Sequence, residues 1–249
     1  MFVALTLMVV MSPVVADHHE ENDGLARVVM ITPKDGHNKA LEEAIVEYHH
    51  YMADKKGSWR YQWYSIETGP DTGKYLARSG GHNYEDFDAV YDWEEEAGKK
   101  FASLVRPHID NMVITITKTD DEIGIWPEDM EGYEYYSVTH WHIMPGHYRA
   151  FNDGLKKIDA TLKEGGWPSY YAFVNPVSGG MGGQTTIVTP RKSFADMAPK
   201  EPSFFDVMNK ALGEEETAAF MAEWSKTYKS GQNYLLRHMK EQSDYGDGK

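Results

Sequence analysis

The chain has 249 residues, which is enough for one large domain or two small ones. Apolar residues make up 41% and charged residues 26%, a composition that excludes a globally disordered chain. The absence of cysteine excludes disulfides, cysteine-ligated zinc, iron–sulfur clusters and thiol nucleophiles, and a net charge of −14 argues against nucleic acid as a partner.

The chain begins with an apolar stretch. Residues 2–11 are almost all apolar, in a run too short to span a bilayer. Val14 and Ala16 are small and fit positions −3 and −1 of a signal-peptidase site, so residues 1–16 are predicted to be a cleavable leader. The alternative is a buried N-terminal strand or helix. With the leader removed, we expect a periplasmic or secreted protein without membrane contact.

Residues 17–24 are predicted to form a polar N-terminal segment. Cleavage before Asp17 would create the terminus Asp17-His18-His19. A free amine with histidine at the third position can hold Cu(II) or Ni(II) in a square plane of four nitrogens. His18 and His19 are therefore candidate metal ligands, and a solvated tail is the alternative.

Two segments that begin at Val28 and Val138, 110 residues apart, resemble each other. In each, a strand-like run leads through a Pro-and-Gly turn into a helix, and the Gly-His pair at 36–37 recurs at 146–147. Both helices carry apolar residues at spacing i, i+4, i+7, i+11, typical of an amphipathic helix. These residues are Leu41, Ile45, Tyr48 and Met52 in the first copy and Phe151, Leu155, Ile158 and Leu162 in the second.

The resemblance continues beyond the helices. Each copy shows an aromatic strand, a glycine-rich hairpin turn, a third strand, a second helix and a last strand. The expected ranges are 59–66, 69–73, 74–79, 94–106 and 111–118, and then 167–174, 178–183, 184–189, 213–229 and 233–239. The sequence thus predicts an α+β protein with two tandem ferredoxin-like β-α-β-β-α-β units. The units span 25–118 and 135–240, with an acidic linker at 119–134 and a polar tail at 241–249.

Such a tandem pair resembles the dimeric α+β-barrel superfamily, which includes antibiotic-biosynthesis-type monooxygenases and NIPSNAP-like proteins. The resemblance rests on the order of elements and on the helix entries TPKDGH and IMPGH, and it covers about residues 25–240. It implies a pseudo-dimeric barrel of two antiparallel sheets, with a pocket between the sheet and the helices of each unit. A second copy in the same chain also covers the bare sheet face of the first. Outer strand edges that stay exposed can pair with a second copy of the chain, so a homodimer is one arrangement that the sequence allows.

Histidines on the first strand of the second unit are candidates for chemistry. Alternation places His140 and His142 on one face and Trp141 on the other. Two such histidines can chelate a metal, shuttle a proton or bind an anion. The alternative is that they are polar strand residues satisfied by their neighbours.

His37 and His147 each follow a glycine at a helix start. They are candidate ligand-binding residues at a pocket mouth, and a capping role in the first helical turn is the alternative. Arg78, near the end of the third strand, and His82 after it are candidates to neutralise an enolate or a carboxylate. Surface placement is the alternative for both.

Aromatic side chains form the last set of candidates. Trp59, Tyr61 and Trp63 share a face in the first unit, as do Trp167 and Tyr171 in the second. Together with Trp141 they are predicted to line a pocket for a flat apolar ligand, and inter-sheet core packing is the alternative.

The resemblance implies a small-molecule enzyme that oxygenates an aromatic or conjugated compound without a bound cofactor, and the predicted leader implies that it is exported. His140, His142 and Arg78 are the candidate catalytic residues; they are chosen from their residue types and positions and are not matched to catalytic residues of the family. The alternatives are a non-catalytic or stress-related module that binds a hydrophobic ligand, and a periplasmic metal binder. No sequence motif supports flavin, NAD or ATP. Haem with a histidine ligand stays open.

Overall fold

The structure, a computed structural model, describes residues 22–244. The predicted leader, the metal-ligand candidates His18 and His19, and most of the polar tail lie outside the described residues. Among the helices of residues 22–244, none is long and apolar enough to cross a membrane.

The elements follow the predicted order. Unit 1 consists of β1 (Leu25–Pro33), α1 (Asn38–Met52), β2 (Gln62–Ile66), β3 (Tyr75–His82), α2 (Glu94–Leu104) and β4 (Ile109–Ile125). Unit 2 consists of β5 (Tyr135–Ile143), α3 (Tyr148–Glu164), β6 (Tyr171–Ser178), β7 (Gln184–Arg191), α4 (Phe204–Leu212), α5 (Glu214–Trp224) and β8 (Tyr228–His238). Helix α4 is an addition to the predicted pattern.

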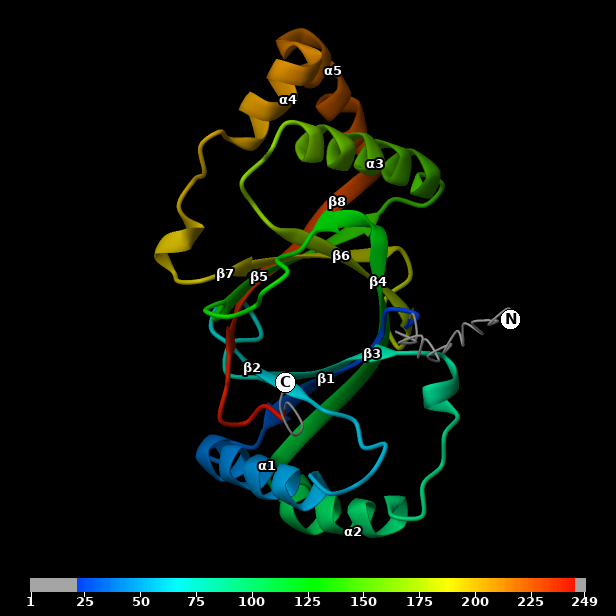
Figure 1. Cartoon of the computed structure of the whole chain (residues 1–249), viewed down its shortest axis with the longest axis vertical. Coiled ribbons are helices and arrows are strands. Elements are labelled where there is room, and N and C mark those ends of the chain that lie inside the picture. Colours follow the sequence, from blue (N-terminus) through cyan, green and yellow to red (C-terminus); the bar gives the residue numbers. More distant parts are fainter. Residues whose placement is uncertain (1–21, 245–249) are drawn as a thin grey trace, which may run out of the picture.

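The eight strands close into one antiparallel barrel in the order β1-β3-β2-β8-β5-β7-β6-β4. Closure depends on the last strand of each unit, because β4 pairs with both β1 and β6 while β8 pairs with both β5 and β2. Helices α1 and α2 cover the outer face of one sheet, and α3, α4 and α5 cover the other (Figure 1). The predicted α+β fold with a pseudo-dimeric barrel is confirmed.

The linker prediction is wrong at its start. Strand β4 continues to Ile125 and pairs with β6 beyond residue 119, with a register shift between Thr119 and Gly124. The first three acidic residues of the predicted linker, Asp120, Asp121 and Glu122, fall in this bulge. Asp121 and Glu122 are exposed, while Ile123 is buried in the core of unit 2. A bulge interrupts the alternation of inward and outward side chains that identifies a strand. The end of β4 therefore does not look like a strand in the sequence, where acidic residues dominate.

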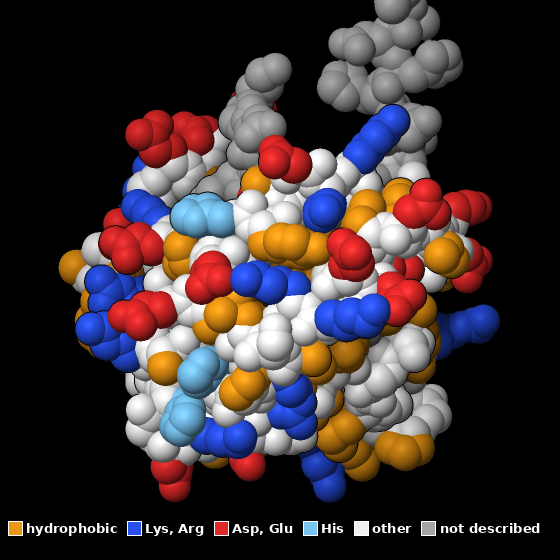
Figure 2. All heavy atoms as spheres, turned by 90° about the horizontal axis from the view of Figure 1, so that it is seen from below, with side chains coloured by type: hydrophobic (Ala, Val, Ile, Leu, Met, Phe, Trp, Pro, Cys, Tyr) orange, Lys and Arg blue, Asp and Glu red, His pale blue; other side chains and the backbone are white. Residues whose placement is uncertain are grey.

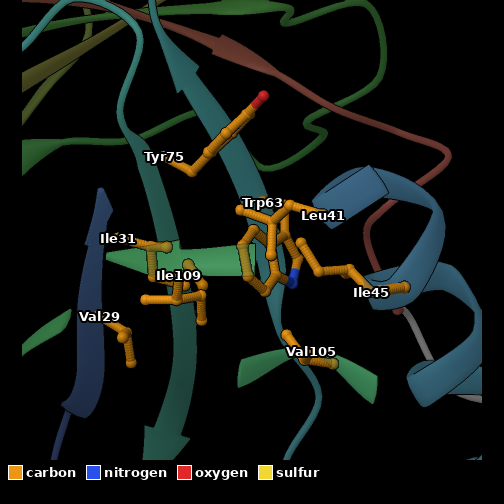
Figure 3. Packing of buried hydrophobic residues seen from close by; sticks show 10 residues of the cluster. Val29, Ile31, Leu41, Ile45, Trp63, Tyr75, Val105 and Ile109 are labelled. Atoms are coloured by element: carbon orange, nitrogen blue, oxygen red, sulfur yellow. The ribbon is translucent and has the colours of Figure 1, made fainter. Parts of the chain in front are cut away.

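Alternation along the strands sorts side chains between the helix-covered outer face and the inside of the barrel. Residues Val29 and Ile31 of β1 pack on the outer face with Leu41 and Ile45 of α1 (Figure 3). The predicted apolar stripe of α3 is buried in the same way in unit 2. A third cluster fills part of the barrel interior and joins both units; its buried members are Tyr64, Ile66, Val138, Tyr234 and Leu236.

The solvent face of α1 and α2 is charged. Acidic and basic side chains are interspersed over this side of the molecule (Figure 2). Some of them pair, as in Lys100 with Glu47 at 2.9 Å and Lys99 with Glu95 at 2.6 Å. Exposed pairs of this kind add little stability, so burial of the apolar stripes holds these helices in place.

Candidate functional site

The aromatic residues predicted to share a face in unit 1 lie on the outer face of its sheet. Strand β2 begins only at Gln62, yet Trp59, Tyr61 and Trp63 all lie on the helix side. Trp63 is 6% exposed and packs under α1 (Figure 3). Its Nε1–H is buried and has no partner among the described residues. A buried donor without an acceptor indicates that water or a ligand completes this layer.

Trp59 lies at the open end of this layer. Its ring stacks on His82 at 4.4 Å between centroids, and Phe87 contacts it edge-on at 4.9 Å. The Arg27 guanidinium lies 5.6 Å from the Trp59 ring and hydrogen-bonds to Tyr61. We call Arg27, Trp59, Tyr61, Ser79 and His82 the Trp59 cluster.

His82 is held by two polar contacts. Its Nε2 lies 2.8 Å from the buried Oγ of Ser79. Its Nδ1 lies 3.7 Å from the Asp86 carboxylate, beyond hydrogen-bond distance. Burial lowers the pKa of His82, only partly opposed by Asp86, so the ring is neutral near pH 7.

The end of β3 explains how His82 reaches Ser79. Gly81 has φ of +81°, a left-handed conformation that favours glycine. This turn brings His82 back to the side of Ser79, three residues earlier. Asp86 is fixed in turn, since its Oδ2 accepts from the backbone N–H of Asn83 at 2.8 Å. Sequence reasoning named Trp59 and His82 but missed Arg27 and Ser79; the motif Ser-Gly-Gly-His was the available signal.

In unit 2 the space between the sheet and the helices is filled by packed aromatic side chains. Trp141 contacts Phe151, Trp224 and Tyr228, and its ring lies 4.9 Å from that of Tyr228. Tyr171 is 3% exposed and donates to Asp159 at 2.8 Å. For Trp141 and Tyr171, and for Trp63 in unit 1, the core-packing alternative describes the placement.

The predicted histidine pair faces the inside of the barrel. His140 Nδ1 lies 2.8 Å from Thr186 Oγ1 and 3.0 Å from Gln184 Nε2, and its Nε2 lies 3.2 Å from the Tyr234 hydroxyl. Burial, helped by His142, lowers the pKa of His140. Both ring nitrogens therefore have partners, which is the expected state of a structural histidine. Among residues 22–244, no three carboxylate or imidazole side chains lie together in a way that could hold a metal ion.

Arg78 also points into the barrel, at another level. Its strand partners are Val28 and Gln62, whereas those of His140 lie on β7. No hydrogen bond or ion pair between described residues joins Arg78 to His140 or His142. The structure thus separates the three predicted catalytic residues into two places.

The two helix-start histidines differ. His37 lies with its Nδ1 3.0 Å from Nδ1 of His108, and His147 is exposed. Neither side chain caps its helix. The expected pair of equivalent pocket-mouth histidines is therefore not formed, because the partner of His37 comes from the residue before β4, and the resembling segments do not include it.

The histidines of the two layers and of the barrel interior offer little to a haem iron. Nε2 of His82 contacts Ser79, Nδ1 of His82 faces the Asp86 carboxylate, and both ring nitrogens of His140 have polar partners. The space between the sheet and the helices of unit 2 is filled by aromatic side chains. These residues do not fit a haem site. Two surface depressions of about 620 and 580 Å³ are lined largely by charged and polar side chains and contain none of the candidate residues.

No family model and no curated protein matches this chain. Solved structures do match it. A protein described as a candidate monooxygenase from Fusobacterium nucleatum has TM-score 0.54 at 11% identity, covering 89% of this chain and 94% of that one. A second protein described as a candidate monooxygenase, from Lactobacillus acidophilus, has TM-score 0.52 at 8% identity, covering 89% of this chain and 96% of that one. An anthrone oxidase-like protein has TM-score 0.51 at 11% identity, covering 88% and 92%. The chain therefore has the fold of the dimeric α+β-barrel superfamily.

Proposed function

We propose that this protein is a monooxygenase-like enzyme that oxidises a small aromatic or conjugated molecule at the Trp59 cluster. The carrying observation is the stack of Trp59 on His82 beside the Arg27 guanidinium. It combines a flat apolar surface, a neutral base and a cation on one half-buried patch. The names of the similar structures support the reaction class, and export remains part of the proposal.

His82 has the features of a base. With Nε2–H donating to Ser79 Oγ, the lone pair of Nδ1 is left for a substrate proton. Protonated Nδ1–H then faces Asp86, whose carboxylate lies 3.7 Å away. Asp86 stabilises the imidazolium that forms, and Ser79 keeps the ring in one tautomer.

Arg27 and the neighbouring tryptophans contact the substrate in the proposed reaction. Removal of a proton from a conjugated ketone or phenol leaves an anion, which the Arg27 guanidinium stabilises electrostatically. The deprotonated carbon of the substrate then bonds to O2 and forms a peroxide. Cleavage of the O–O bond, with loss of the second hydrogen of that carbon, leaves one oxygen atom as a C=O group and releases the other as water, so the CH2 group of the substrate supplies all the electrons that O2 accepts. The buried Nε1–H of Trp63 is available to a polar atom of the substrate.

Oxygen uptake tests the proposal. Anthrone plus O2 gives anthraquinone plus water, and it is measured against a protein-free blank. We expect the protein to exceed the blank and His82→Asn to lower the rate by roughly 10²- to 10⁴-fold, the usual contribution of a general base. Arg27→Met should lower it too. Equal rates for His82→Asn and the unaltered protein would refute the assignment of His82.

Binding without turnover is the second candidate function. It is favoured by the contacts of His82 with Ser79 and Asp86, which hold the ring in place. Quenching of tryptophan fluorescence by anthrone, without oxygen uptake above the blank, would decide for binding. If anthrone causes neither quenching of fluorescence nor oxygen uptake, both candidate functions are refuted for this ligand class.

A further inference from the structure

Arg78 occupies an unusual place inside the barrel. Its neighbours in β3, Ala77 and Ser79, are buried, and Ala77 belongs to the cluster under α1, so Arg78 points to the opposite face. On that face Leu76, one alternation away, packs against the inner cluster. The Arg78 side chain is only half-buried, so solvent reaches it.

Tyrosines surround the guanidinium. Tyr64 and Tyr136, whose rings meet edge-on at 5.2 Å, lie near Arg78. The Tyr64 hydroxyl donates to Gln62 Oε1 at 3.0 Å. Gly80 leaves room for the charged end, since a Cβ at that position would lie 2.4 Å from Nη1 of Arg78. Two aromatic rings, an amide and a glycine without a side chain thus lie around one cation.

No carboxylate of the described residues pairs with Arg78. The twelve ion pairs between these residues leave it out. Partial burial lowers the pKa of the guanidinium, the direction expected for a cation that loses part of its contact with water. A charge in such a place without a counter-ion is costly, although the chain as a whole carries an excess of acids.

We propose that Arg78, flanked by Tyr64 and Tyr136, binds a small carboxylate inside the barrel, at a site separate from the Trp59 cluster. The planar guanidinium fork matches the two oxygens of a carboxylate and can bind both at once. The tyrosine rings form apolar walls for the carbon atoms of the ligand. A bound carboxylate supplies the counter-charge that the described residues do not.

Thermal unfolding in sodium acetate tests this site, with sodium chloride at equal ionic strength as the reference. A ligand that binds only the folded state raises the Tm. We expect acetate to raise the Tm of the unaltered protein. Arg78→Met should lose this rise, which corresponds to a loss of affinity on the order of 10- to 100-fold for a charge-assisted contact. Arg78→Lys should retain part of it.

Two further measurements keep the proposal falsifiable. In the absence of acetate, Arg78→Met should unfold at the same or a higher temperature, because an unpaired charge is replaced by an apolar chain. The exposed-arginine variant Arg149→Met should respond to acetate like the unaltered protein. So should Arg27→Met, which separates this site from the proposed function. A persistent acetate effect in Arg78→Met, an equal effect of chloride, or a lower Tm of ligand-free Arg78→Met would overturn the proposal.

Discussion

Nε2 of His82 lies 2.8 Å from Oγ of Ser79, three residues earlier in the chain. The hydroxyl is 2% exposed, so water does not compete for this contact. In unit 2 the equivalent positions, 110 residues further on, are Thr189 and Lys192. The polar pair is thus a property of unit 1, where we place the candidate site.

Ser79→Ala should destabilise the fold. The substitution removes the partner of the His82 ring and leaves a polar nitrogen unsatisfied, at a cost of about 1–2 kcal/mol in the free energy of unfolding. Urea denaturation measures this change. Ser103→Ala is the matched control, because Ser103 is exposed and bonds only within its helix. Equal effects of the two substitutions would show that the Ser79 contact adds nothing.

Stability should fall as the solution is acidified below neutral pH. Burial lowers the pKa of four histidines, His49, His82, His140 and His238, from the ordinary value of 6.5. Between each lowered pKa and 6.5 the unfolded chain binds more protons than the folded one, so the free energy of unfolding rises with pH.

The Tm measured from about pH 5 to about pH 8 should therefore increase through the histidine range. His140→Gln should flatten the increase, since it removes one of the four groups. His147→Gln, at an exposed position, is the control. A Tm independent of pH in this range would contradict the burial of these rings in neutral form.

Local pattern was sufficient to predict most of the helices and strands but not which of them lie side by side. The stripe at Leu41 and Ile45 predicts the buried face of α1, and alternation places His140 and His142 together correctly. Which face of β3 meets the helices depends on barrel closure through β4 and β8. Long-range pairing of this kind has no signature in a local sequence, so the separation of Arg78 from His140 and His142 could not be predicted.

Helix α4 was missed for a different reason. Its start carries a capping box, in which Ser203 accepts from the N–H of Asp206 and Asp206 accepts from the N–H of Ser203. The signal was present in the sequence. Similarity to unit 1 predicted a single second helix in each unit, and this analogy concealed the extra turn-and-helix segment that packs Val207 and Met208 into the core.

Two helical glycines should respond oppositely to alanine. A Cβ at Gly154 in α3 would lie 2.2 Å from Trp224 Cδ1, inside a packed core, so Gly154→Ala should lower the free energy of unfolding by about 1–3 kcal/mol. Gly98 in α2 has no atom within 4 Å of the added Cβ, so Gly98→Ala should raise it by about 0.5–1 kcal/mol. Urea denaturation of both variants checks the pair. Similar values for the two would contradict the close contact of α3 with Trp224.

Asp159 of α3 should couple β6 of unit 2 with the end of β4 from unit 1. Its Oδ1 accepts from the Tyr171 hydroxyl and from the backbone N–H of Gly124, each at 2.8 Å, which ties α3 to β6 and to the bulged end of β4. Burial and the bond to Asp159 raise the pKa of Tyr171, so the hydroxyl stays protonated as a donor. Tyr171→Phe should therefore cost about 1–2 kcal/mol.

Asp159→Ala should cost more than Tyr171→Phe, because it leaves both the hydroxyl and the Gly124 amide without an acceptor. In a double-mutant cycle the two substitutions should be non-additive by about 0.5–3 kcal/mol, as for residues in direct contact. Tyr148→Phe, at an exposed tyrosine in the same unit, should change stability little. Strict additivity of Tyr171→Phe and Asp159→Ala would show that the hydroxyl and the carboxylate do not bond in solution.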